Sequence, residues 1–201
     1  IYAGVMSGDG GLTKQGAGSF TLSRASTFTG TTTVSAGTLA LGVADAIANT
    51  SAVVVDGASA VFALGGFSDT VGAVSIGTAG GSITSSSGVL TGTSYTFSNT
   101  SGNAGVVSAK LAGTNVTLTQ SGTGTTTLSG LNTYTGTTTV SAGSLVLARG
   151  SAIASTGAVD LSVSGANLTL SASQTIGSLA GVTGSTVTLG SNTLTTGDAN
   201  N

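Results

Sequence analysis

The amino-acid sequence predicts an all-β solenoid, in which the strands of successive coils lie over one another. The segment TFTGTTTVSAG at residues 27–37 returns as TYTGTTTVSAG at residues 133–143, an offset of 106 residues. Short segments of alternating apolar and polar residues recur along the chain, and Gly, Asn, Asp or Ser separate them. A chain that repeats one unit stacks copies of that unit instead of building one closed core.

The predicted strands are short and rich in Thr and Val, whose branched side chains suit a pleated surface. We expect strands at residues 19–22, 38–41, 52–55, 61–64, 73–76, 95–97, 115–118, 145–147, 167–170 and 186–189. Gly recurs every few residues and no sustained helical period is present, so long helices are not expected. Residues 44–48 are expected to form a single turn, with residues 150–154 as their counterpart.

The repeat extends well beyond its opening motif. Leu39 corresponds to Leu145 and, with a one-residue shift, the segment 70–72 corresponds to 175–177. The sequence therefore predicts one β-helix segment over residues 1–201, made of two long repeats at about 4–104 and 105–201. If a coil uses about 20 residues, the chain forms roughly ten coils with strands about 4.8 Å apart.

An antiparallel β-sandwich is the main alternative fold. It would show frequent two-residue hairpin turns such as Asn-Gly or Asp-Gly. The chain has no Asn-Gly, and its two Asp-Gly pairs lie at residues 9–10 and 56–57. The solenoid is therefore favoured, with inward Leu, Val, Ile and Ala forming a thin core, outward Thr and Ser forming hydroxyl ladders, and Gly at the corners.

Composition excludes several classes of function. The chain is 39% hydrophobic with a net charge of −2, which argues against disorder. The four basic residues are far apart in sequence, so nucleic-acid binding is not expected; they are Lys14, Arg24, Lys110 and Arg149. No apolar run approaches the roughly 20 residues that span a bilayer, so no membrane insertion by this segment is expected.

The chemical inventory predicts no enzyme. Without His or Cys, neither a Ser-His-Asp nor a Cys-His arrangement can form. A Ser-Lys pair using Lys14 or Lys110 and a glycosidase-type pair of carboxylates stay open as alternatives. The acids are isolated in sequence and are interpreted as turn residues that make local hydrogen bonds; they are Asp9, Asp45, Asp56, Asp69, Asp160 and Asp198. We therefore predict no catalytic, cofactor-binding or metal residues and no cofactor.

Two further motifs are weighed against simple structural roles. The turn 8–11, Gly-Asp-Gly-Gly, could donate oxygen ligands to calcium, but no iterated Gly-Gly-x-Gly-x-Asp series supports a calcium-binding roll. Four glycosylation sequons arise readily in a chain so rich in Ser and Thr, and the Asn side chains are expected to form ladders; they begin at Asn49, Asn99, Asn115 and Asn167.

Two stretches resemble a known family. The residues that carry the likeness are 11–18 (GLTKQGAG), 20–23 (FTLS) and 27–39 (TFTGTTTVSAGTL) in the first copy, and 122–145 in the second. They resemble the autotransporter-associated β-strand repeat. The first copy departs from the pattern at 24–26 (Arg-Ala-Ser), where the second has Gly-Leu-Asn.

The resemblance implies a right-handed parallel β-helix from the passenger region of a bacterial type V secreted protein. It implies a structural and adhesive stalk segment, displayed on the cell surface or secreted, and anchored in the outer membrane through a separate barrel domain. Its expected partners are a host or neighbouring-cell surface, or another copy of the protein. In the family, an ending such as 192–201 leads into a segment such as 2–8, so we expect the chain to be a fragment of a longer array.

Two other functions stay open. Thr31 and Thr33, with Thr137 and Thr139, supply outward Thr-x-Thr pairs that could order water in an ice-binding module, although the sequence shows them once per long unit. A carbohydrate-binding module, or a β-helical polysaccharide-processing enzyme or phage fibre, would use aromatic platforms. The chain has only five Phe and three Tyr.

Overall fold

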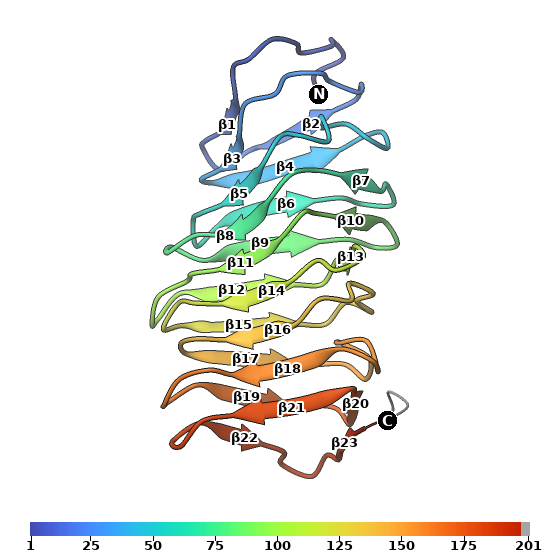
Figure 1. The fold of residues 1–201 in the computed structure, drawn as a ribbon. Coiled ribbons are helices and arrows are strands. Elements are labelled where there is room, and N and C mark those ends of the chain that lie inside the picture. Colours follow the sequence, from blue (N-terminus) through green and yellow to red (C-terminus); the bar gives the residue numbers. More distant parts are fainter. Residues whose placement is uncertain (198–201) are drawn as a thin grey trace.

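The computed structural model describes residues 1–197 and confirms the predicted solenoid (Figure 1). These residues form 23 β-strands and no helix. Every pairing between strands is parallel and joins one coil to the next. Each of the two main sheets holds nine strands, so the stack has about nine coils, close to the roughly ten expected.

The first main sheet forms one long face of the stack. Its strands, in spatial order, are β1 (Leu12–Lys14), β3 (Thr32–Val34), β5 (Val53–Val55), β8 (Val74–Ile76), β11 (Tyr95–Phe97), β14 (Leu118–Gln120), β16 (Thr138–Val140), β18 (Ala158–Leu161) and β21 (Ser178–Gly181). The expected strand at 115–118 lies instead at β14, because Asn115 adopts a turn conformation with φ of 59°.

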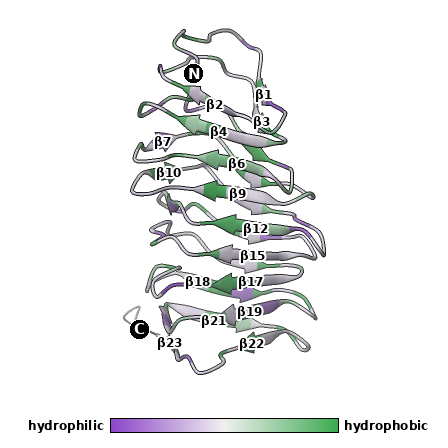
Figure 2. Ribbon diagram, turned by 180° about the vertical axis from the view of Figure 1, so that it is seen from behind, coloured by the Kyte–Doolittle hydropathy of each residue, from purple (hydrophilic) through white to green (hydrophobic). Residues whose placement is uncertain are grey.

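The second main sheet forms the opposite face, as the view from behind shows (Figure 2). Its strands are β2 (Ser19–Leu22), β4 (Gly37–Leu41), β6 (Ala60–Ala63), β9 (Gly81–Thr84), β12 (Ala104–Val107), β15 (Thr125–Leu128), β17 (Ser144–Leu147), β19 (Asn167–Leu170) and β22 (Thr186–Thr188). A short third side carries two small sheets, β7 (Asp69–Thr70) with β10 (Val89–Thr91) and β13 (Lys110–Ala112), and β20 (Gln174–Ile176) with β23 (Leu194–Thr196).

The length of the coil explains the coil count. Successive strands of the first sheet are joined by steps such as Leu12 to Thr32 and Tyr95 to Leu118, which are 20 and 23 residues. Eight steps carry the chain from Leu12 in β1 to Leu179 in β21, or about 21 residues a coil. The extra residues lie in the turns, so fewer coils fit into the same chain.

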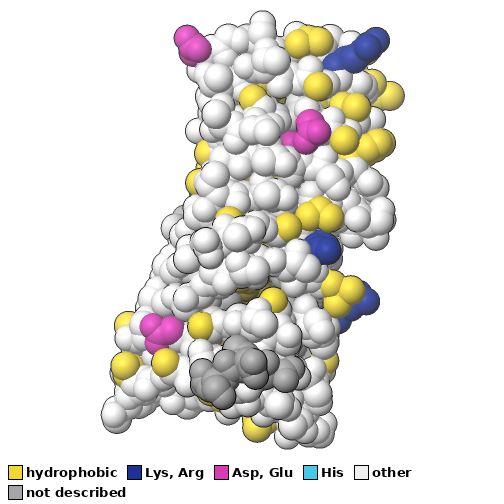
Figure 3. Space-filling model, turned by 45° about the vertical axis from the view of Figure 1, so that its right-hand side comes forward, with side chains coloured by type: hydrophobic (Ala, Val, Ile, Leu, Met, Phe, Trp, Pro, Cys, Tyr) yellow, Lys and Arg dark blue, Asp and Glu magenta, His cyan; other side chains and the backbone are white. Residues whose placement is uncertain are grey.

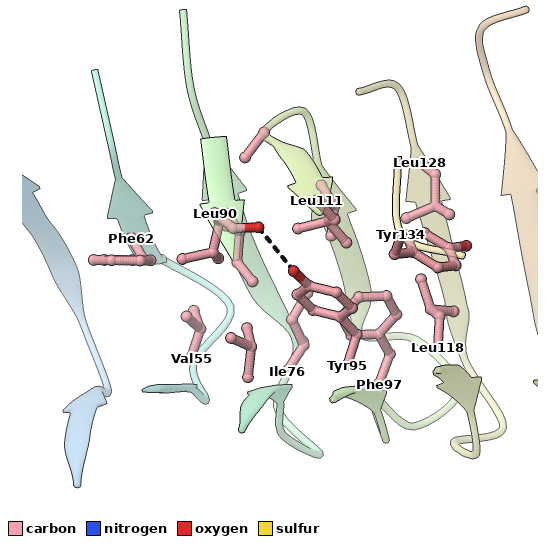
Figure 4. Packing of buried hydrophobic residues seen from close by; sticks show 14 of the residues in the cluster. Val55, Phe62, Ile76, Leu90, Tyr95, Phe97, Leu111, Leu118, Leu128 and Tyr134 are labelled. Atoms are coloured by element: carbon pink, nitrogen blue, oxygen red, sulfur yellow. Dashed lines mark hydrogen bonds between the residues drawn. The ribbon is translucent and has the colours of Figure 1, made fainter. Parts of the chain in front are cut away.

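Alternation of buried and outward residues along most strands produces the core, whereas β21, β22 and β23 at the C-terminal end have no buried residue. On the second sheet Leu39, Phe62 and Ile83 lie over one another in register and are fully buried. The aromatic rings of Tyr95 and Phe97 fill the middle coils, where Leu90 and Leu111 pack beside them (Figure 4). Burying such side chains contributes about 1.5–3 kcal/mol each, and the stack replaces a globular core with a continuous column.

One glycine in each repeat fixes the corner between the two main sheets. Gly37 and Gly143 have φ of 64° and 60°, a region that other residues rarely adopt. A Cβ on either residue would overlap backbone carbonyls of the preceding coil, those of Gly16 and Gly18 for Gly37. The motif therefore ends in Gly because the chain must both turn and pass close to its neighbour.

Candidate functional site

Lys14, one of the two lysines considered for a Ser-Lys pair, has a structural role. Its side chain is buried at the end of β1, and its Nζ donates to the carbonyl oxygens of Gln15, Gly16 and Ala36 at 2.9, 2.6 and 2.9 Å. Three carbonyl partners hold the ammonium charge and close the corner between two coils. We call this set of three hydrogen bonds the Lys14 clamp, because it holds the backbone of two neighbouring coils together.

The aspartates are distributed over different parts of the coil. Asp9 lies in the first turn, where it accepts a hydrogen bond from Thr29 Oγ1 at 3.4 Å, and Asp160 points outward from β18. Asp56 Oδ1 accepts from Ala79 N at 2.8 Å. Within residues 1–197 no three His, Cys, Asp or Glu side chains are grouped to hold a metal ion. Asp198 lies outside the described residues.

Among the aspartates within residues 1–197, Asp69 alone lies in the interior. It begins β7, is 1% exposed, and its Oδ2 accepts from the backbone N of Ile47 at 3.1 Å. Burial, with a smaller contribution from the charge of Asp45, raises the pKa of Asp69 from 3.8 to about 7. The expectation that these acids make local hydrogen bonds is wrong for Asp9, Asp56 and Asp69, because each accepts a hydrogen bond from the neighbouring coil.

The corresponding corner of the second repeat carries side-chain amides where the first repeat has the carboxyl group of Asp69. Gln174 is the counterpart of Asp69; its Oε1 accepts from Ala152 N at 3.1 Å and its Nε2 donates to Ile153 O at 3.0 Å. Asn132, two coils earlier, accepts from Leu111 N and donates to Ala152 O, both at 2.8 Å. These side chains supply hydrogen bonds to backbone groups where the third side has no continuous strand ladder.

Buried tyrosines tie the middle coils together. Tyr95 Oη lies 2.7 Å from the carbonyl oxygens of Leu90 and Ala112, and the Leu90 contact is drawn in Figure 4. Burial raises the pKa of Tyr95 to about 12 and raises that of Tyr134 further. Tyr134 Oη is 2.7 Å from Thr138 Oγ1. Both phenols are therefore neutral structural groups.

The four sequons fall in different environments. Asn99 is fully buried; its Nδ2 donates to Asn103 O and Thr125 O, and its Oδ1 accepts from Thr126 Oγ1. That side chain has no room for a glycan in the folded chain. Asn49 and Asn115 are exposed, and Asn167 is half-buried on the outward face of β19.

The outward face of the first sheet carries more hydroxyl pairs than the sequence suggested. Thr31 and Thr33 flank the buried Thr32, and the pair at 137 and 139 flanks Thr138. Register places Thr96 of β11 beside Thr119 of β14, and Thr119 beside Thr139 of β16. Ser94, Thr117 and Thr137 directly precede these three strands and complete the pairs. Hydroxyl pairs thus occupy three consecutive coils. The pair at 117 and 119 is a further Thr-x-Thr that the sequence analysis left out, and a search for Thr-x-Thr misses the pair at 94 and 96 because one member is Ser.

No helix within residues 1–197 has the length and hydropathy of a membrane span. The comparison with family models gives one match. The model described as passenger-associated-transport-repeat matches residues 12–41, from β1 to β4, and residues 118–147, from β14 to β17. These are the two segments that carried the resemblance in the sequence, and the match confirms it. No curated protein and no solved structure matched the chain.

Proposed function

The chain carries two passenger-associated-transport repeats, and from this premise we propose that it is a non-catalytic stalk segment of a bacterial autotransporter passenger. In this role it extends from the cell surface, or is secreted, and adheres to other cells or surfaces. A separate outer-membrane barrel anchors it. The parallel solenoid supports the proposal, because a stack of coils gives length at about 4.8 Å a coil from little sequence.

Surface chemistry supports an adhesive role without catalysis. The long faces present Thr, Ser and short apolar side chains in rows. In the interior, Asp69 and Tyr95 make hydrogen bonds to the backbone, and Tyr134 makes one to the side chain of Thr138. Such rows offer many weak contacts whose strengths combine when many copies are displayed. The partner we propose is a host or neighbouring-cell surface, or a second copy of the protein.

The experiment is display of the full chain on a Gram-negative cell through a fused autotransporter barrel. We expect the chain to be cleaved from intact cells by added protease and to raise adherence several-fold over cells that carry the barrel alone. The matched control is a chain with Gly37→Val and Gly143→Val, which disrupts the coil corners. A folded, displayed chain with no gain in adherence would remove the adhesive role and leave the stalk.

A second candidate is an ice-binding face. The observation that favours it is the array of hydroxyl pairs on β11, β14 and β16, which repeats at the strand spacing over a regular sheet. Thermal hysteresis of the purified chain tests it, with Thr117→Lys as the disrupting variant. Absence of hysteresis in the unaltered chain removes this candidate.

A further inference from the structure

A shallow groove crosses four coils at the corner where the second sheet turns into the third side. Its volume is about 230 Å³. The residues that line it are Ser85, Ser86, Ser87, Gly88, Ser108, Lys110, Gly130, Leu131 and Arg149. The groove runs along the solenoid axis for three coil spacings, about 14 Å, so its shape suits an extended ligand.

The groove concentrates positive charge in a chain that has little charge. It contains two of the four basic residues, Lys110 and Arg149, and no acid lines it. Lysine and arginine side chains lie along one edge of the molecule (Figure 3). In contrast to Lys14, neither cation of the groove donates to a protein acceptor within residues 1–197, so both are free to meet a ligand.

Coil length brings the two cations together. They are 39 residues apart in sequence, close to two coils, and so lie on the same corner. Lys110 opens β13, which pairs with Val89 of β10, and Arg149 follows β17 by two residues. The intervening coil contributes Leu131, whose side chain is 43% exposed between them.

From this placement we propose that the groove binds an acidic polysaccharide, a sugar chain that carries carboxylate groups. Lys110 and Arg149 pair with carboxylates two coils apart. The hydroxyls of Ser86, Ser87 and Ser108 exchange hydrogen bonds with sugar hydroxyls, and Leu131 packs against the apolar face of a ring. The inference names a ligand class for the adhesive role proposed above and rests on it for its biological meaning.

Other ligands fit the groove less well. Single-stranded nucleic acid binding uses stacking on aromatic side chains and a longer track of cations, and no aromatic residue lines this groove. A neutral sugar would leave both cations without a partner. Carboxylates spaced along a sugar chain match two cations that lie two coils apart, with the coil of Leu131 between them.

The experiment measures binding to the purified full chain at low salt, with mannuronate oligosaccharides as the probe and mannose oligosaccharides as the neutral control. Lys110→Gln and Arg149→Gln are each expected to weaken mannuronate binding about fivefold. Arg24→Gln removes the same charge outside the groove and is expected to leave the affinity unchanged. Circular dichroism and thermal midpoints establish that all variants fold alike.

Four outcomes would overturn the proposal, and the first three are no mannuronate binding by the unaltered chain, equal weakening by Arg24→Gln, and tighter binding of a single-stranded DNA oligomer than of mannuronate. Retained affinity in a double Lys110→Gln, Arg149→Gln variant would also overturn it. Binding is measured on the isolated chain, so its failure is separate from a failure of surface display.

Discussion

The first and second repeats surround almost the same backbone with different buried side chains. Phe28 in the first repeat stands where the second has Tyr134, whose hydroxyl lies 2.7 Å from Thr138 Oγ1. Thr32, the counterpart of Thr138, is buried and its Oγ1 has no partner. The unsatisfied atom of the first repeat is thus explained by the hydroxyl that only the second repeat supplies.

The other two buried polar atoms without a partner within residues 1–197 also lie where the two repeats carry different side chains. Asp69 Oδ1 has no partner, whereas the Nε2 of its counterpart Gln174 donates to Ile153 O. Gln120 Oε1 has no partner, whereas its counterpart Lys14 carries only donors and all its bonds are made. Buried polar positions in these coils work as sets, and a change of one member leaves another without a partner at a cost of about 1–3 kcal/mol.

The largest expected effect is a dependence of the free energy of unfolding on pH, which Asp69 causes in the first repeat and its counterpart Gln174 does not cause in the second. Because the folded-state pKa of Asp69 is raised from 3.8 to about 7, its contribution to the free energy of unfolding is fully present below pH 4 and is lost as pH rises through 7. One pKa unit corresponds to 1.36 kcal/mol, so the loss approaches about 4 kcal/mol. Urea unfolding of the unaltered chain and Asp69→Asn, measured from pH 4 to 8, tests this.

Asp69→Asn should be the more stable chain at pH 8, and its stability should depend less on pH than that of the unaltered chain. The reciprocal change Gln174→Glu should introduce a loss of stability with rising pH in the second repeat. Parallel pH profiles for Asp69→Asn and the unaltered chain would show that Asp69 does not titrate in this range.

Next in size is the loss of the corner amide of the second repeat. Asn132→Ala leaves Leu111 N and Ala152 O without partners, and we expect a loss of about 3 kcal/mol. Its counterpart Ser26 makes one long bond, accepting from Met6 N at 3.4 Å, so Ser26→Ala should cost under about 1 kcal/mol. Equal losses in thermal unfolding would contradict the difference between the corners.

A smaller effect is expected from exchanging the aromatic residues. Phe28→Tyr supplies the hydroxyl that Thr32 lacks and should stabilise the chain by about 1 kcal/mol, while Tyr134→Phe should destabilise it by about 1–2 kcal/mol. Hydrogen exchange of the amides in β3 and β16 gives a local readout. Protection that falls in β3 after Phe28→Tyr would mean that the hydroxyl does not fit there.

The smallest effect is expected at the Lys14 clamp, where the Lys14 side chain bonds to backbone carbonyls of the first repeat. Lys14→Gln installs the residue that the second repeat uses, whose Nε2 reaches Gly122 O at 2.9 Å. We expect a loss under about 1 kcal/mol, whereas Lys14→Ala removes every donor and should cost about 2 kcal/mol. A midpoint in urea for Lys14→Gln as low as that for Lys14→Ala would show that the charge itself is required.

Much of the fold could be predicted because the alternation of apolar and polar residues and the 106-residue repeat are both visible in the sequence. The strands at 19–22, 95–97 and 167–170 have the predicted bounds. The burial of Asp69 could not be predicted in this way, since its partner Ile47 lies 22 residues away and the register decides the contact. The groove was missed for the same reason, because Lys110 and Arg149 are close only once the coil length is known.

The nearly constant coil length has a consequence for how the protein reaches its native state. Hydrogen-bonded partners between coils are separated by about one coil wherever they lie in the chain, as for Leu12 with Thr32 and for Leu161 with Gly181. The entropy lost in closing each new loop is therefore nearly the same at every step and does not grow with the total length. A nascent coil needs only its predecessor as a template, so ordering can advance from one end while the remaining chain is still extended.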